Sequence, residues 1–159
     1  VTLGQEFNHL DMYVQLLNFR YNGTFKLRLP DPPPDMQMLL MKLMFQPIVE
    51  NAVYHGMDEA KAGMDIRIDY RMEGTDHVFA VKDNGIGMTA EALSLLRARL
   101  DRRGPAEKGW GIGLRNVHER LKLRYGETYG ITIDSEVGRG TTVTVRFPVS
   151  AEQGGLPNG

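Results

Sequence analysis

Residues 83–88, with the sequence DNGIGM, combine a carboxylate with two glycines at the end of a predicted strand. Ionised Asp83 only accepts hydrogen bonds, which suits a donor such as the amino group of a purine. Gly85 and Gly87 have no Cβ, so their backbone can approach a flat ring closely, and Met88 follows directly. Because Asn-Gly is also a common turn, the segment alone is more typical of a turn than of a base-binding loop.

A second glycine-rich segment, residues 109–114 with the sequence GWGIGL, opens a predicted helix. Glycines there expose successive N–H groups, and the helix N-terminus adds partial positive charge, so the two together bind phosphate. A mobile loop before a helix would carry the same glycines. Gly104 and Gly109 have the spacing of a P-loop, but Trp110 stands where that motif needs a lysine, so the P-loop class is excluded.

Two further elements complete the candidate chemistry. Glu50 and Asn51 interrupt an apolar helical surface. Mg²⁺ usually takes one or two protein oxygens beside phosphate oxygens, so Asn51 could serve as a ligand, and Glu50 could accept a proton. After the turn at residues 138–140, Thr141 could add a hydroxyl near a base, and Thr142 follows it. The alternatives are a capping or packing role for the helical pair and a plain hairpin turn for the other segment.

The composition limits the partners these residues can have. A chain of 159 residues can bury a core unaided, and without cysteine it has neither disulfides nor thiolate chemistry. Its net charge of −1 gives no electrostatic footprint for nucleic acid or for an anionic membrane. No apolar run reaches the roughly 18 residues of a membrane span. Since the sequence starts in mid-pattern without Met, we expect a fragment of a longer protein.

The N-terminal elements must hold Glu50 and Asn51. Apolar residues spaced 4, 3, 4, 3 and 4 apart form a heptad seam on a helix predicted over residues 3–21. The seam fits either a helix docked on its own domain or the end of a dimerising helical hairpin. After a short strand at 25–29, the proline-rich residues 30–35 form a stiff connector and the best candidate domain boundary.

A long helix is predicted over residues 36–56, capped by Asp35 and kinked at Pro47. Strict alternation of apolar and polar residues predicts two hairpins, at residues 66–81 and 131–147. Between them, a 3.6-residue period predicts two helices, at residues 89–101 and 112–125. We therefore expect an α/β (α+β) fold: a mostly antiparallel sheet with its helices on one face, a two-layer sandwich.

The order of the four segments resembles that of the Bergerat (GHKL) ATPases, which include gyrase, Hsp90, MutL and the histidine kinases. The resemblance covers about residues 36–149. Within the family, residues 46–52 (QPIVENA) resemble the N box, and residues 113–121 the second glycine box, of sensor histidine kinases of the LytS/YesM type. Residues 5–21 resemble the last stretch of their dimerisation helices.

The resemblance implies three parts, namely the end of a dimerisation helix, an ATP-binding catalytic domain and a disordered tail, at residues 1–24, 25–150 and 151–159. It also implies that the chain binds ATP with Mg²⁺. Asn51 would ligate Mg²⁺, Glu50 would help to activate the attacking group, and Asp83 would bind the adenine amino group with support from Thr141. The other ATP contacts would be His55, Gly85, Gly87, Met88, Lys108, Gly109, Gly111, Ile112, Gly113, Leu114 and Thr142, with residues 102–110 as a lid.

Two departures from the family pattern stand out. Tyr54 occupies a position where many relatives have lysine, so Lys108 or Arg115 would have to compensate at the phosphates. The segment around His9 reverses the order of the phosphoacceptor motif, in which His is followed by Phe and Asn. We therefore expect the acceptor histidine to lie upstream, outside this chain.

The resemblance implies that the parent is a homodimeric, membrane-anchored sensor with this domain in the cytoplasm. The parent would phosphorylate a histidine and pass the phosphate to a response regulator, with no nucleic-acid partner. The alternatives are an ATP-driven clamp of the gyrase or MutL kind and an anti-sigma serine kinase. The heptad helix joined directly to the domain and the short lid argue against the clamp.

Overall fold

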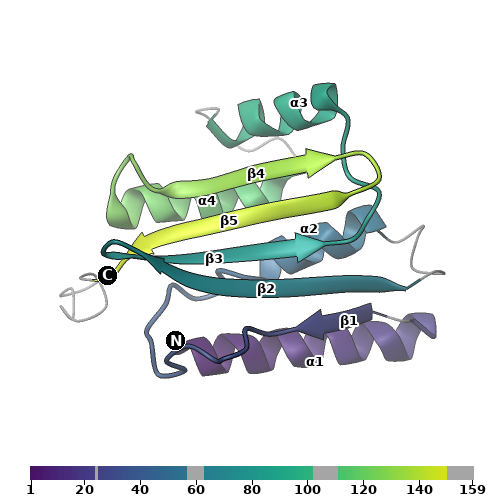
Figure 1. The fold of residues 1–159 in the computed structure, drawn as a ribbon, viewed down its shortest axis with the longest axis horizontal. Coiled ribbons are helices and arrows are strands. Elements are labelled where there is room, and N and C mark those ends of the chain that lie inside the picture. The colour runs from purple at the N-terminus through teal and green to yellow at the C-terminus, as the bar shows by residue number, and fades with distance from the viewer. Residues whose placement is uncertain (24, 57–62, 102–110, 150–159) are drawn as a thin grey trace.

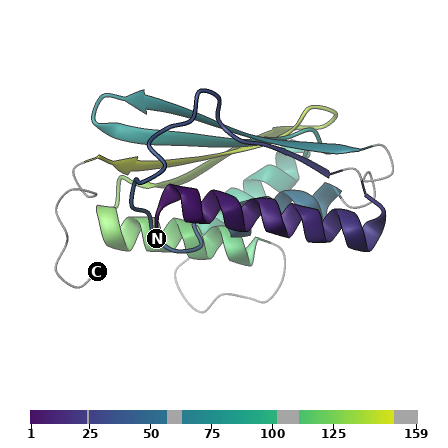
Figure 2. The same cartoon turned by 90° about the horizontal axis from the view of Figure 1, so that it is seen from below.

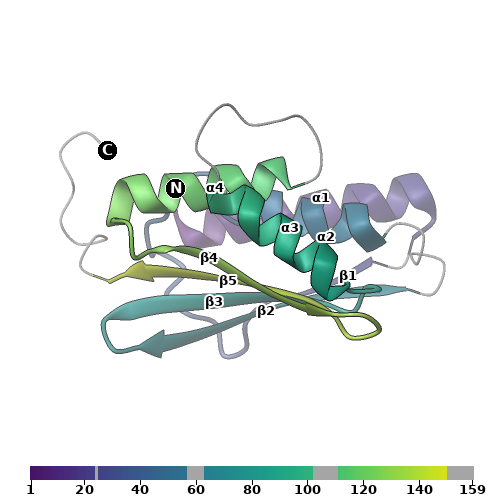
Figure 3. The ribbon, with the colours of Figure 1, turned by 90° about the horizontal axis from the view of Figure 1, so that it is seen from above.

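The computed structural model describes residues 1–23, 25–56, 63–101 and 111–149. Helices and strands follow one another as α1 (Leu3–Tyr21), β1 (Phe25–Arg28), α2 (Gln46–Gly56), β2 (Met64–Glu73), β3 (Asp76–Asp83), α3 (Ala90–Asp101), α4 (Ile112–Tyr125), β4 (Gly130–Glu136) and β5 (Gly140–Pro148). Five strands form one sheet in the order β1-β2-β3-β5-β4 (Figure 1). The helices lie on one face of the sheet, as the two views along its plane show (Figures 2 and 3).

The two hairpins form the body of the sheet. β2 and β3 pair antiparallel, as do β4 and β5, and β5 lies between β4 and β3. Only the edge pair β1 and β2 is parallel. Alternating side chains put Ile66 and Ile68 under the helices and Arg67 and Asp69 on the open face, as predicted. The predicted two-layer fold with a mostly antiparallel sheet is confirmed.

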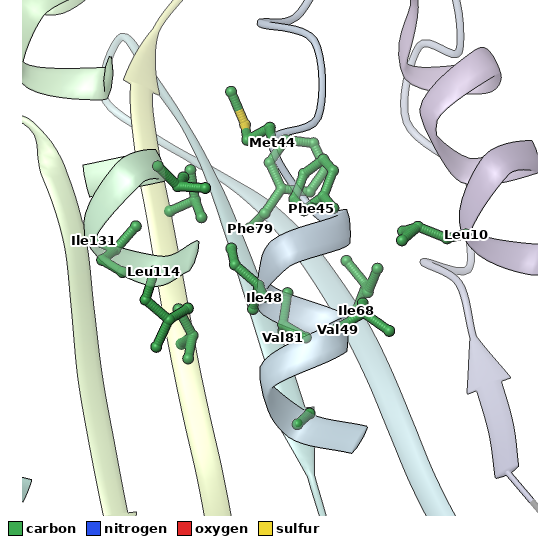
Figure 4. Close-up of a cluster of buried hydrophobic side chains, with 14 of the residues drawn as sticks. Leu10, Met44, Phe45, Ile48, Val49, Ile68, Phe79, Val81, Leu114 and Ile131 are labelled. Carbon is green, nitrogen blue, oxygen red and sulfur yellow. The ribbon is translucent and has the colours of Figure 1, made fainter. Parts of the chain in front are cut away.

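The core fills the space between the sheet and the helices. Phe45, just before α2, meets Phe79 of β3 edge to face, with ring centroids 5.0 Å apart. Ile48 and Val49 of α2 and Leu114 of α4 pack beside them, all at most 1% exposed (Figure 4). The elements that carry the candidate site are therefore fixed to one another by a shared core.

α1 belongs to the same core. Its seam residues Leu3, Phe7, Leu10 and Val14 are at most 4% exposed, and Figure 4 shows Leu10 directed at the core. Buried Glu6 accepts the N–H of Phe45 at 3.0 Å, across the interior. The first four residues of the seam that suggested a dimerisation helix are thus covered by the helix's own domain, whereas Tyr21 at the end of the seam is 44% exposed.

The predicted helix over residues 36–56 is wrong in its first half, because only α2 is helical. Pro47 is the second residue of α2, where its missing N–H leaves no hydrogen bond unmade, so it starts the helix rather than kinking it. Residues 36–40 instead exchange backbone hydrogen bonds with residues 1–4. Leu43 has a φ of 57°, which a helix does not allow.

Asp35 caps no helix either. Its side chain accepts the N–H of Gln37 at 2.9 Å, which is a local turn. Of the apolar residues that suggested one helical face, Leu40, Met44 and Ile48 are at most 6% exposed, whereas Leu39 and Leu43 are 54% and 41% exposed. Backbone partners distant in sequence, rather than local periodicity, decided this segment.

Candidate functional site

Asp83 is the last residue of β3, and its carboxylate is held in place by the backbone. Oδ1 accepts the N–H of Gly85 at 2.9 Å and that of Thr141 at 3.3 Å. Burial raises the pKa of the Asp83 carboxyl above its usual range, while the two backbone hydrogen bonds act in the opposite direction. Both of these hydrogen bonds are made to Oδ1, so Oδ2 is the atom through which Asp83 can accept a hydrogen bond from a ligand.

The loop after β3 is pressed against the turn between β4 and β5. Gly87 has a φ of 73°, and a Cβ on it would lie 2.0 Å from the carbonyl oxygen of Glu136. Gly140 has a φ of 83°, and its Cβ would lie 2.0 Å from the carbonyl oxygen of Asp83. Both positions therefore require glycine for packing as well as for backbone conformation. Gly87 was predicted to let the backbone approach a ring, whereas its close contact in the structure is with Glu136 of the neighbouring turn.

Ser135 of β4 is a part of this site that no sequence pattern predicted. Its hydroxyl accepts the N–H of Met88 at 2.8 Å and donates to the carbonyl oxygen of Gly140 at 3.0 Å. It also lies 2.8 Å from the hydroxyl oxygen of Thr141. Ser135 thereby ties the loop after β3 to the start of β5. No local motif marks it, because its partners are 5 to 47 residues away in sequence.

Replacing Ser135 with alanine is expected to lower the free energy of unfolding by about 2 kcal/mol, because it leaves a half-buried N–H and a carbonyl unsatisfied. Chemical denaturation measures this loss. The control is Ser94→Ala, at an exposed position of α3, which should change stability by less than about 0.5 kcal/mol. Equal effects of the two substitutions would show that the Ser135 hydroxyl does not hold the loop.

Asn51 of α2 joins two cavities. The smaller one is lined by residues of α2, the loop after β3 and β5: Asn51, Ala52, Asp83, Gly85, Ile86, Gly87, Met88 and Thr141. The larger one, of about 650 Å³, lies along α2 between α1 and the start of α4, and Asn51, Glu50, Tyr54, Gly111 and Gly113 are among its lining residues. The structure therefore brings the predicted base-binding and phosphate-binding segments to the two sides of one asparagine.

The start of α4 shows why its glycines are needed. Gly111, the N-cap, has a φ of 84°, and a Cβ on it would lie 2.6 Å from Leu96 of α3. Gly113 allows close packing, since its Cβ would lie 3.2 Å from Pro47 of α2. Leu114 is fully buried and anchors the helix in the core. The residues of this first turn, Gly111 to Leu114, line the larger cavity.

The described part of the chain does not place every predicted site residue at the two cavities. Val143 faces the core, so its neighbour Thr142 lies on the open face of the sheet, and Thr142 lines neither cavity. Its contact with ATP stays a prediction that this geometry does not support. His55 belongs to α2, but the structure describes only its backbone. Lys108 and Gly109, with the predicted lid and the tail, lie outside the described residues.

Arg115 is placed differently from the compensating role suggested for it. It is 6% exposed, and its Nε donates to Glu119 at 3.0 Å. Tyr54, in contrast, is 72% exposed at the larger cavity. A buried guanidinium already paired with a carboxylate is a structural group, so Arg115 is a poor substitute for the lysine found in relatives.

The described residues contain no group of three or more His, Asp or Glu side chains placed to hold a metal ion. This finding for the described residues does not conflict with Mg²⁺ binding, because Mg²⁺ keeps several waters and takes few protein oxygens when phosphates supply the rest. The amide of Asn51, between the two cavities, fits that role. Across the described part of the chain, no helix has the length and apolar character needed to cross a membrane.

Comparison with known proteins agrees with this geometry. The family model described as histidine kinase-, DNA gyrase B- and HSP90-like ATPase matches residues 37–151. The sensor protein kinase HptS of Staphylococcus aureus (strain USA300) is 31% identical over 150 residues, which make up 94% of this chain and 28% of that protein. The histidine kinase domain of the Erythrobacter litoralis EL346 blue-light activated histidine kinase superposes with a TM-score of 0.63 at 18% identity, covering 96% of this chain and 67% of that one.

The chain belongs to the histidine kinase-, DNA gyrase B- and HSP90-like ATPase family. Its fold is that of a histidine kinase ATPase domain, and its curated relatives are sensor kinases. The family resemblance drawn from residues 36–149 is confirmed. The chain spans less than a third of the length of HptS.

Proposed function

We propose that this domain binds ATP with Mg²⁺ and aims the terminal phosphate at a histidine of the parent sensor kinase. The observation that carries the proposal is the position of Asn51, between the cavity that contains Asp83 and the cavity bordered by the start of α4. A nucleotide laid across Asn51 would have its base at the carboxylate and its phosphates at the helix N-terminus. The carboxylate would then accept a hydrogen bond from the base, and the helix N-terminus would donate hydrogen bonds to the phosphates.

Each described residue would have a defined task in this arrangement. Asp83, oriented by Gly85 and Thr141, would accept a hydrogen bond from the adenine amino group. Asn51 would supply one oxygen to Mg²⁺, which neutralises phosphate charge when bound. Glu50, exposed and in contact with Gln46 at 2.9 Å, would take up the proton of the attacking group. The catalysis is mainly positioning and charge stabilisation.

The acceptor would lie in a part of the parent outside this chain. Among the histidine side chains that the structure describes, His77 and His118 are each 6% exposed. His77 pairs with the hydroxyl of Tyr70, and His118 accepts the N–H of Ile131. His9 is exposed on α1, in a motif that runs in reverse order. We propose that the isolated domain binds ATP without phosphorylating itself.

The larger assembly is part of the same proposal. The parent would act as a homodimer, anchored in a membrane with this domain in the cytoplasm, and would pass the phosphate to a response regulator. The relative HptS, which is a sensor protein kinase, supports this over a clamp ATPase or an anti-sigma serine kinase. Because the first four residues of the α1 seam are buried in its own domain, dimer contacts would mainly use other surfaces.

Titration calorimetry with ATP tests the proposal, with and without Mg²⁺, on the wild type and on Asn51→Ala. In the wild type, Mg²⁺ should tighten ATP binding. In Asn51→Ala, that gain should shrink by about tenfold because the protein oxygen is lost. Tyr54→Phe, on the same helix, is the control and should keep the full gain. A wild type that binds no ATP, or labelled phosphate on His9, would refute the proposed function.

A further inference from the structure

The larger cavity has a wall that the proposed function does not use. This wall comes from the second half of α1 and consists of Tyr13, Leu17, Arg20 and Tyr21. It faces Glu50, Asn51 and Tyr54 of α2 and the first turn of α4 across the same cavity. Burial and the nearby Glu50 raise the pKa of the Tyr13 hydroxyl, which agrees with the closeness of α1 and α2. Both sides of the groove therefore belong to one site.

Charge distinguishes Arg20 from the other residues of the groove. Among the described residues that line it, Arg20 is the one cation and Glu50 the one anion. A nucleotide polyphosphate carries more negative charge than a single Mg²⁺ neutralises, so a second cation is expected at the phosphate end. Tyr54 cannot supply it, and Arg115 is buried against Glu119. Arg20 remains as a described cation that borders the groove.

The end of α1 is well anchored for such a role. The amide of Asn18 donates to the carbonyl of Phe25 and accepts the N–H of the same residue, both at 2.9 Å. Asn22 ends the helix in the left-handed conformation, with its N–H bonded to Asn18. Arg20 lies between these two residues, exposed, with its guanidinium 5.4 Å from the ring centre of Tyr21. A fixed backbone and an exposed guanidinium suit phosphate binding.

We propose that Arg20 contacts the terminal phosphate of the bound nucleotide and so favours ATP over ADP. The inference rests on the proposed function, because it needs the base at Asp83 and the phosphates beside Asn51. In that orientation the phosphate furthest from the base would lie in the groove beside the start of α4. The second half of α1 is the opposite wall of the groove at this end. The plainer role of Arg20 is to stabilise the C-terminus of α1 through its charge and its contact with Tyr21. That role would not depend on the number of phosphates.

Calorimetry with Mg-ATP and Mg-ADP separates the two roles. Arg20→Met, which keeps an apolar side chain of similar length, should weaken ATP binding about tenfold and ADP binding at most about twofold. Arg20→Lys, which retains the charge without the planar fork, should fall between Arg20→Met and the wild type for ATP. Arg28→Met makes the same charge change on β1, outside the groove, and should leave both affinities unchanged.

The outcomes are distinct. If the wild type binds neither nucleotide, the proposed function fails and the role of Arg20 fails with it. If the wild type binds ATP but Arg20→Met weakens ATP and ADP equally, or neither, only the role of Arg20 is overturned. Thermal melting of each variant checks folding, and because Arg20 is exposed, both Arg20 variants are expected to melt close to the wild type. If Arg20→Met melts at a lower temperature than the wild type, the test rests on Arg20→Lys. The inference is then refuted if Arg20→Lys binds ATP and ADP with the same affinities as the wild type, and hence with the same ratio between them.

Discussion

Asp83→Asn is expected to weaken ATP binding by at least about 100-fold, or about 3 kcal/mol, while leaving the fold intact. The amide oxygen can still accept the N–H groups of Gly85 and Thr141, so it should take the place of Oδ1. The amide nitrogen then replaces Oδ2 and presents a donor to the adenine amino group, which is also a donor. Two opposed donors in a half-buried pocket leave both groups unsatisfied. Calorimetric titration with ATP measures the effect.

Asp69→Asn is the matched control. It makes the same chemical change on the open face of the sheet, where Asp69 pairs with Arg67 and Lys82. ATP affinity should be unchanged in this variant. Similar losses in both variants would point to a general charge effect, and no loss in Asp83→Asn would remove the proposed adenine contact.

Asp83→Asn should also change how the stability of the protein depends on pH. The pKa of Asp83 is raised in the folded protein, chiefly by burial, so the folded state holds the proton more tightly than the unfolded state does. Stability is therefore lost as pH rises from the ordinary pKa of 3.8 through the folded value, and the loss is complete above it. Asp83→Asn removes this loss. Its stability relative to the wild type should rise between about pH 4 and neutrality, as denaturation at several pH values would measure.

Gly140→Ala is expected to lower the free energy of unfolding by about 4 kcal/mol or more, and to abolish ATP binding. A Cβ at this position would lie 2.0 Å from the carbonyl oxygen of Asp83 and 3.1 Å from the Cα of Asn84. Neither atom can move without displacing the end of β3. The substitution therefore combines backbone strain with displacement of the carboxylate that the proposal assigns to adenine.

Gly138→Ala isolates the packing part of this effect. Gly138 lies in the same turn with the same φ of 83°, but nothing stands within 4 Å of where its Cβ would be. The left-handed backbone alone should cost about 1–2 kcal/mol, and ATP binding should persist. Chemical denaturation of both variants gives the comparison. Equal losses of stability would mean that the contact between Gly140 and Asp83 is not tight.

Local patterns predicted most of the fold because they act over a few residues. Alternation in β2 and β3 fixed which side chains are buried, since a one-residue shift would put Ile66 and Ile68 on the open face. The helical period placed α3 and α4 to within a residue or so. The candidate site was predicted in the same way: Asp83 at a strand end and Gly111 at a helix start are positions set by local chemistry.

Contacts between distant residues decided the rest. Residues 36–45 have an apolar pattern that fits a helix, but residues 36–40 pair with the backbone at the N-terminus, and Pro47 starts α2. The glycine at 87 is required by the carbonyl of Glu136, 49 positions later in the sequence, and not only by a ligand. Ser135 carries no motif, because its role consists entirely of bonds to other segments.

The sequence by itself determined the family, the two layers and the order of the four segments that surround the proposed nucleotide site. Periodicity and glycine placement are local properties, so they can be recognised in the sequence without knowing which segments pack against each other. Only the tertiary structure decided that the first four seam residues of α1 are buried in its own domain, that Thr142 lies on the open face of the sheet and that Arg20 borders the groove. Those outcomes depend on which surfaces pack together, and the packing is settled by the whole core at once.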